Sequence, residues 1–425
     1  MKSINLQTRR EFLRTTTLGS AMTWTLPAFI DLTMRSLHAE ALQSTTQHVT
    51  GRDSTILVVL QLAGGNDGLN TVVPWGNDYY YQARPRLAIA QNDVLKINDE
   101  LGFHPEMSGL QTLYEDGKLA IIQGAGYPNP NRSHFRSMEI WQTATDADRF
   151  EQHGWLGRFF DHECAGMDAA IGIHLTHNAP QAFAARQPKG VATSPRQSRY
   201  STTMRGGFEL DATDGASISE LGGVGQLNAD ERPLDFIQRT ALDAKVSEAQ
   251  ISKALDAHPG EGQYPAHRLG QELEMIARLI AGGMSTRVYY VSQGGYDTHV
   301  NQTSTHSRLL KDMSDAVYAF VNDLKAQGNL DRVAIMTFSE FGRRVRQNAS
   351  SGTDHGAAAP VFVAGGNVHG GLYAKMPSLA PEDLDRGDLR HATDFRSIYA
   401  TLLEKHLYAS HVPILGRSFP LLDFI

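Results

Sequence analysis

The sequence predicts an α/β fold in which a mostly parallel central sheet carries helices on both faces. Five runs are continuously apolar and rich in β-branched residues, as strands buried on both sides usually are. These runs cover residues 55–62, 118–126, 287–293, 332–338 and 360–366. The segments between them place apolar residues three and four positions apart, which is typical of amphipathic helices. Strands that alternate with helices in this way indicate helices packed against both faces of one sheet.

The helical segments have recognisable limits. Apolar spacing predicts helices within residues 104–117, 133–144, 268–283, 306–328 and 394–407, and several of these end at a glycine, a common helix stop. Residues 186–230 are different, because they are rich in Gly, Ser, Thr and Arg and lack periodicity. We expect a surface insertion or a lid there. The pattern of residues 232–256 predicts a helix that closes this insertion.

The first forty residues are better explained as a targeting signal than as part of the fold. Adjacent Arg9 and Arg10 are followed by a Phe-Leu pair and a mildly apolar run too short to span a bilayer permanently. This pattern resembles a twin-arginine export signal, and the alternative is an ordinary amphipathic first helix. We expect a signal peptide over residues 1–41, cleaved after Ala41 or, alternatively, after Ala39. The twin-arginine translocase is then a partner, and residues 42–425 form a periplasmic or secreted α/β domain.

Composition excludes several classes of protein. The chain has 425 residues with 39 Lys and Arg against 46 Asp and Glu, a formal charge of −7, which is the wrong sign for a nucleic-acid-binding protein. Cys164 is the only cysteine, so no disulfide can form within the chain. No run beyond the leader approaches the roughly 18 apolar residues of a membrane helix. We therefore expect no permanent membrane span.

Polar residues gather where the predicted strands end. In open α/β sheets ligands bind beyond the carboxyl ends of the strands, so these positions are the candidates for chemistry. Each of the first four predicted strands is followed by polar residues of this kind, and the fifth strand is preceded by the loop GTDHG. The candidates in chain order are Asp67, Ser133, Asp297, His299, Glu340, Asp354 and His355.

Each candidate also has a purely structural explanation. Asp67 could be a turn residue, and Ser133 could only cap the helix that starts after it. Asp297 and His299 could cap a loop, and Glu340 could form an ion pair with a neighbouring arginine. As a set, carboxylates and imidazoles suit a divalent metal ion. Zinc is our first expectation, and manganese, calcium or magnesium are the alternatives where oxygen ligands dominate.

The combination of these motifs resembles a known superfamily. AGGNDGLN, NRSHF, GGYDTH, SEFGRR and GTDHG follow one another in the order found in the alkaline phosphatase and sulfatase superfamily. More closely, the chain resembles an uncharacterised bacterial family of that superfamily that carries twin-arginine signals and is named only as a domain of unknown function. The resemblance runs from Ile56 to the carboxyl terminus, and it implies an alkaline-phosphatase-like fold.

The resemblance also implies roles for individual residues. It assigns ligands to two metal ions, the first held by Asp67, Asp354 and His355 and the second by Asp297 and His299. Glu340 would be a further ligand or a carboxylate that balances charge. Ser133 would be the nucleophile, bound by the first metal ion, and Arg132 or Arg343 would hold the non-bridging oxygens of the substrate. The superfamily adds a late histidine to the second site, for which His369 and His391 are the candidates.

The expected function is that of an exported metal-dependent hydrolase of phosphate or sulfate esters with a serine nucleophile. The substrate would be a small-molecule or glycan ester. The Cys-x-Pro-x-Arg stretch from which many sulfatases make an aldehyde nucleophile is missing, because Cys164 stands in HECAG. The alternative function is a non-catalytic secreted protein that binds a partner or a surface and has kept the fold.

Overall fold

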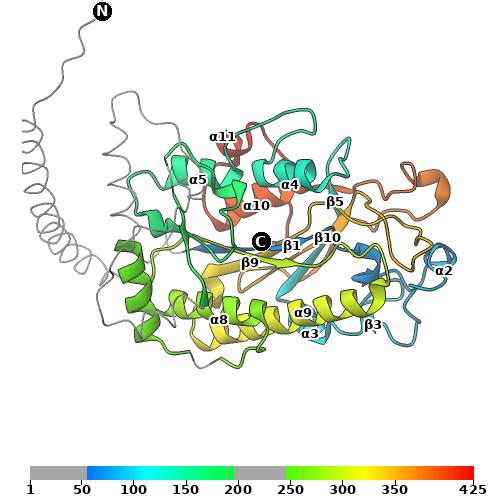
Figure 1. Cartoon of the computed structure of the whole chain (residues 1–425), viewed down its shortest axis with the longest axis horizontal. Coiled ribbons are helices and arrows are strands. Elements are labelled where there is room, and N and C mark those ends of the chain that lie inside the picture. The colour runs from blue at the N-terminus through cyan, green and yellow to red at the C-terminus, as the bar shows by residue number, and fades with distance from the viewer. Residues whose placement is uncertain (1–54, 188, 196–245, 261) are drawn as a thin grey trace, which may run out of the picture. The chain divides into compact units, whose positions relative to one another are not determined.

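A nine-stranded sheet forms the centre of the protein (Figure 1). The structure is a computed structural model that describes residues 55–187, 189–195, 246–260 and 262–425. The strands pair in the order β11-β5-β10-β9-β1-β8-β6-β7, and β12 also pairs with β5. Their bounds are Ile56–Ala63 for β1, Leu119–Gly126 for β5, Gly172–His174 for β6, Val191–Ala192 for β7, Val288–Gly294 for β8, Val333–Phe338 for β9, Ala359–Gly365 for β10, Gly371–Tyr373 for β11 and Thr393–Asp394 for β12.

Only β10 runs against the other strands of this sheet. It pairs antiparallel with both β9 and β5, whereas β1, β8, β9, β6 and β7 pair in parallel and so do β5, β11 and β12. The first residue of β10 therefore lies at the edge of the sheet where β1, β5, β8 and β9 end. The five predicted strands and the mostly parallel sheet are confirmed.

Helices cover both faces of the sheet (Figure 1). The bounds on one face are Ser108–Glu115 for α3, Arg268–Ala281 for α8 and Gln302–Ala326 for α9. Those on the other are His134–Thr143 for α4, Trp155–Glu163 for α5, Phe395–Thr401 for α10 and His411–Leu415 for α11. In β1, Val58 and Leu60 pack in the core on the α9 side, while Leu57 and Val59 pack in the core on the α4 side. This explains why the strand sequences are continuously apolar.

Several short elements were not predicted, because segments of two to six residues leave little periodic signal. A second sheet pairs β2 (Val72–Val73), β4 (Gly102–Phe103) and β3 (Leu95–Lys96), and α2 spans Asp78–Ala83. One π-helical turn covers Leu402–His406. Short 3₁₀ turns lie at Gly68–Asn70, Ala169–Ile171, Gln181–Phe183, Leu330–Arg332 and Pro381–Asp383.

Three expectations fall wholly or partly outside the described residues. The signal peptide over residues 1–41 and most of the insertion over residues 186–230 lie there. Of the closing helix expected over residues 232–256, the part from residue 246 is described and is helical. Within the described residues, we find no helix with the length and apolar character needed to cross a bilayer.

Candidate metal centre

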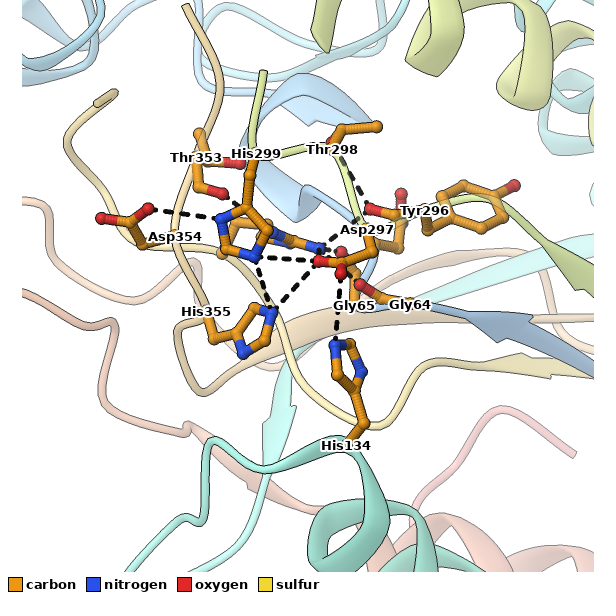
Figure 2. Close-up of polar contacts among 12 residues, drawn as sticks. Gly64, Gly65, His134, Tyr296, Asp297, Thr298, His299, Thr353, Asp354 and His355 are labelled. Atoms are coloured by element: carbon orange, nitrogen blue, oxygen red, sulfur yellow. Dashed lines mark hydrogen bonds and ion pairs between the residues drawn. The ribbon is translucent and has the colours of Figure 1, made fainter. Parts of the chain in front are cut away.

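Three side chains from two loops converge at the carboxyl edge of the sheet (Figure 2). Asp297 and His299 follow β8, and His355 lies just before β10. Asp297 Oδ1 lies 3.0 Å from His299 Nε2 and 3.1 Å from His355 Nε2. The two Nε2 atoms are 2.9 Å apart. We call Asp297, His299 and His355 the ligand triad, because its three donor atoms face one another across one small space.

His134 adds a fourth donor from the other side of the site. It is the first residue of α4, and its Nε2 lies 3.5 Å from Asp297 Oδ2. Donor atoms of His134, Asp297 and His355 all lie within 4.8 Å of one another. The sequence-based prediction at this position was its neighbour Ser133. The imidazole of His134, in the same NRSHF motif, is a possible metal ligand that this prediction left out. The structure thus brings an unpredicted histidine to the site.

Glu340 lies behind His134 rather than beside the ligand triad. Its buried Oε1 is 2.9 Å from His134 Nδ1 and accepts the backbone N–H of Gly64 at 2.8 Å. A carboxylate that accepts the Nδ1–H of a histidine fixes the ring and directs Nε2 outward, an arrangement common behind metal-binding histidines. Gly64 is needed here, since its φ is +121° and a Cβ would lie 2.5 Å from Asp297 N.

Asp354 plays a similar part for His299. Its Oδ1 is 3.3 Å from His299 Nδ1 and accepts from Asn348 Nδ2 at 3.2 Å. The hydrogen bond from Asn348 is the main reason why the pKa of Asp354 lies below its usual range. The structure therefore places Asp354 behind one imidazole of the ligand triad.

Arg343 ties the loops of the site together. This buried side chain donates to Gly65 O at 2.7 Å, to Thr353 O at 2.8 Å and to Tyr296 O at 3.0 Å. It also pairs with Asp297 Oδ1 at 2.7 Å. Burial alone would raise the pKa of Asp297, but contacts with Arg343 and His355 outweigh it and lower the pKa to about 2. Asp297 is thus ionised at neutral pH, as a metal ligand must be. With its donors used inside the protein, Arg343 has a positioning role here.

Asp67 is held in a separate buried cluster. Its Oδ2 pairs with Arg84 at 2.6 Å and accepts from the amide of Gln302. Burial alone would raise the pKa of Asp67, but the neighbouring Arg84 charge outweighs it and lowers the pKa. Within the described chain, no hydrogen bond or ion pair joins Asp67 to Asp354 or His355. The resemblance groups Asp67 with Asp354 and His355, whereas in the structure Asp67 contacts Arg84 and Gln302 instead.

Ser133 and Arg132 lie at the start of α4. Ser133 is exposed at the N-cap position, and its side chain makes no capping hydrogen bond. Arg132 pairs with the buried carboxylate of Asp388 through Nε at 2.8 Å, and its backbone O accepts from His355 Nδ1 at 2.9 Å. Arg132 thus orients a member of the ligand triad through its main chain. The nucleophilic role of Ser133 stays a prediction.

Gly352 offers a test of how closely the loops are packed. A Cβ at this position would lie 2.1 Å from the backbone oxygen of His299. Because His299 belongs to the ligand triad, its backbone cannot move aside without displacing that triad. We expect Gly352→Ala to cost roughly 1 to 3 kcal/mol of unfolding free energy and to weaken metal binding. Denaturant unfolding and metal titration measure the two effects.

Gly294→Ala is the matched control, because an added Cβ at Gly294 meets nothing within 4 Å. This variant should keep near-wild-type stability and metal affinity. Equal behaviour of the two variants would show that the Gly352 contact does not hold His299 in place.

Comparisons with known proteins give a family and distant structural likenesses. A search of curated proteins found no significant match. A protein of the alkaline phosphatase superfamily from Vibrio parahaemolyticus is 10% identical, with a TM-score of 0.37 over 87% of this chain and 70% of that one. Alkaline phosphatase from the Antarctic bacterium TAB5 is 12% identical, with a TM-score of 0.34 over 75% of this chain and 94% of that one.

A Bacteroides thetaiotaomicron protein of glycosaminoglycan metabolism is 10% identical, with a TM-score of 0.32 over 76% of this chain and 70% of that one. Identities and TM-scores this low do not indicate a function, so the function has to be argued from the site itself. The family model described as "Protein of unknown function (DUF1501)" matches residues 54–423, and the chain belongs to this family.

Proposed function

We propose that the protein is an exported metal-dependent hydrolase of phosphate or sulfate esters, with one divalent cation held by the ligand triad and His134. The observation that carries this proposal is the direction of the imidazole lone pairs. Three histidines use Nδ1 for contacts within the protein and turn Nε2 toward Asp297.

The tautomers follow from the partners. His355 Nδ1 faces the carbonyl of Arg132, which only accepts, so Nδ1 carries the proton. The Nδ1 atoms of His134 and His299 face the carboxylates of Glu340 and Asp354. The Nε2 atoms of His299 and His355 cannot both be protonated, because the two N–H groups would then point at each other across 2.9 Å. Lone pairs brought together beside a carboxylate repel one another unless a cation lies among them.

The donor set fits a divalent ion. Ligands around an ion with bonds of about 2.1 Å lie about 3.0 to 3.4 Å apart, close to the separations within the ligand triad. Three imidazoles and one carboxylate favour zinc, while manganese remains the alternative with harder ligand preferences. When bound, such a cation would polarise a phosphoryl or sulfuryl oxygen.

The chain's own residues supply the rest of the proposed chemistry. Ser133 is exposed beside His134 at the start of α4, where free backbone amides favour an anion. We propose it as the nucleophile, with the adjacent Arg132 as the candidate to hold substrate oxygens, although its guanidinium is paired with Asp388. The substrate would be a small-molecule or glycan ester. Export by the twin-arginine route is part of the proposal, and its signal lies in residues outside the described structure.

The direct test combines metal content with an activity screen. Purified mature protein should contain a divalent metal and should hydrolyse at least one chromogenic phosphate monoester, phosphate diester or sulfate ester. Removal of the metal by a chelator should abolish that activity, and zinc or manganese should restore it. A metal-bound protein that is inert on all three ester classes would instead favour a non-catalytic secreted binding protein.

Ser133→Ala separates catalysis from helix capping. The Ser133 side chain makes no capping hydrogen bond, so its loss should change the melting temperature little. If Ser133 is the nucleophile, turnover should fall by at least about 100-fold while metal content stays the same. The measurement is kcat on the ester found in the screen.

Ser410→Ala is the matched control, since Ser410 is also an exposed N-cap residue without a capping hydrogen bond, at the start of α11. It should keep wild-type turnover. A Ser133→Ala protein with near-wild-type turnover would remove the serine from the mechanism and leave water as the attacking group.

A further inference from the structure

The buried pair of Asp67 and Arg84 occupies the place where the resemblance puts the first of its two metal ions, the one assigned to Asp67. Both side chains are fully buried, and Arg84 NH1 lies 2.6 Å from Asp67 Oδ2. The same oxygen accepts from Gln302 Nε2. A carboxylate buried in this way needs a positive partner, and here the protein supplies one from its own chain.

Arg84 is fixed by bonds to several segments. Its Nε donates to Val345 O at 2.9 Å, and its NH2 donates to Arg344 O at 2.9 Å. NH1 also donates to Asn70 Oδ1 at 2.8 Å. All three nitrogens of the guanidinium are engaged, so this cation is a permanent part of the fold.

Gln302 connects this pair to the loops of the ligand triad. Its Oε1 accepts from Thr298 Oγ1 at 3.2 Å and from Thr353 Oγ1 at 2.6 Å. Thr298 stands between Asp297 and His299, and Thr353 is two residues before His355. Asp67 is thereby linked to both ligand loops through hydrogen bonds, without being a ligand.

The formal charges leave room for one divalent ion. Asp67 is balanced by Arg84, and Asp297 is balanced by Arg343. Within the described part of the chain, Glu340 and Asp354 remain as two carboxylates without an arginine of their own in hydrogen-bond contact. Two remaining negative charges match one divalent cation. A second would give the site an excess of positive charge.

We propose that Arg84 takes the place of the metal ion that the resemblance assigns to Asp67, so that the protein binds one divalent cation per chain and Asp67 serves as an internal anchor for the ligand loops. This inference rests on the proposed metal centre. The late histidine that the resemblance adds to the site of Asp297 and His299 has no match in His369, whose Nδ1 lies 3.2 Å from Asp423 O near the carboxyl terminus. At that site His134 supplies a further imidazole instead.

One observation points the other way. Asp67 Oδ1 is buried and has no hydrogen-bond partner among the described residues. A cation at this oxygen would stand close to the guanidinium of Arg84, whose charge would repel it. The experiment must therefore count metal ions directly.

The test is metal stoichiometry, measured by elemental analysis after dialysis of the mature protein loaded with zinc or with manganese. We expect one equivalent per chain. Two equivalents would overturn the inference while leaving the proposed hydrolase intact, whereas the complete absence of bound metal would overturn the proposed function itself. This count does not depend on whether any variant folds.

The double variant Asp67→Asn with Arg84→Met removes the pair together, so that neither charge is left buried alone. We expect it to keep one equivalent and a zinc dissociation constant within about tenfold of wild type, the lower end of the losses seen when supporting residues are changed. Asp297→Asn is the comparison and should lose the bound metal. Loss of metal by the folded double variant to the same extent as by Asp297→Asn would show that Asp67 is a ligand.

Discussion

Asp297→Asn is expected to release the metal and to abolish hydrolysis. The substitution keeps the size of the side chain and an oxygen that Arg343 can still contact, but it removes the negative charge that the ligand triad shares. Changing a residue that merely supports a metal ligand costs about 10- to 100-fold in affinity, so the loss of a ligand charge should exceed about 100-fold. Calorimetric titration with zinc and elemental analysis measure the effect.

Asp315→Asn serves as the control for Asp297→Asn. Asp315 lies on α9 and pairs with Lys311 at 2.8 Å, an exposed ion pair that contributes little to stability. Metal affinity should be unchanged in this protein. If Asp297→Asn bound zinc as tightly as Asp315→Asn, the convergence of the ligand triad would have no role in binding a cation.

Arg343→Met should produce the largest loss of stability. Arg343 is buried, and its guanidinium joins the loop after β1, the loop after β8 and the loop before β10. Removing it takes away the donor of Gly65 O and of Thr353 O, while Tyr296 O keeps the backbone N–H of Thr298. Asp297 is half-exposed and can be hydrated, so the main cost comes from the buried carbonyl oxygens that lose their donor, at about 1 to 3 kcal/mol each. We expect the free energy of unfolding to fall by roughly 2 to 6 kcal/mol for two such oxygens.

The adjacent Arg344→Met is a sharp control because the two positions differ in burial. Arg344 is partly exposed, and its side chain contacts Asp388 at 3.5 Å and Arg386 O at 3.0 Å. Its loss should cost less than the loss of Arg343, because the buried carboxylate of Asp388 keeps its ion pair with Arg132. Denaturant unfolding of both variants compares them, and equal losses would show that Arg343 does not organise the site.

The loops that form the candidate site could be selected from the sequence. Apolar runs locate the strands, and the rule that ligands bind at carboxyl ends then selects the loops that contain Asp297, His299 and His355. Their individual partners could not be predicted in the same way. Ser133 and His134 are neighbours at a helix start, and only the path of the backbone decides which side chain enters the site.

The environment of Asp67 shows a second limit. Its partner Arg84 comes from a loop with no periodic pattern, and Gln302 comes from the start of α9. Pairing between such distant segments is a product of tertiary structure, and one sequence contains no local signal for it. The motif AGGNDGLN therefore drew attention to the carboxylate of Asp67, but it gave no sign that Arg84 balances its charge.

The reversal of β10 has a consequence for how the site is assembled along the chain. Since β9 ends and β10 begins at the same edge, residues 339–358 leave the sheet and re-enter it without crossing to the opposite side. Glu340, Arg343 and His355 can therefore share one loop that stays at this edge, whereas a parallel connection would have to carry the chain over a face of the sheet to the opposite edge. Lengthening this single loop should weaken metal binding while the sheet stays intact. Changes in the metal affinity of the site are therefore best made in this loop.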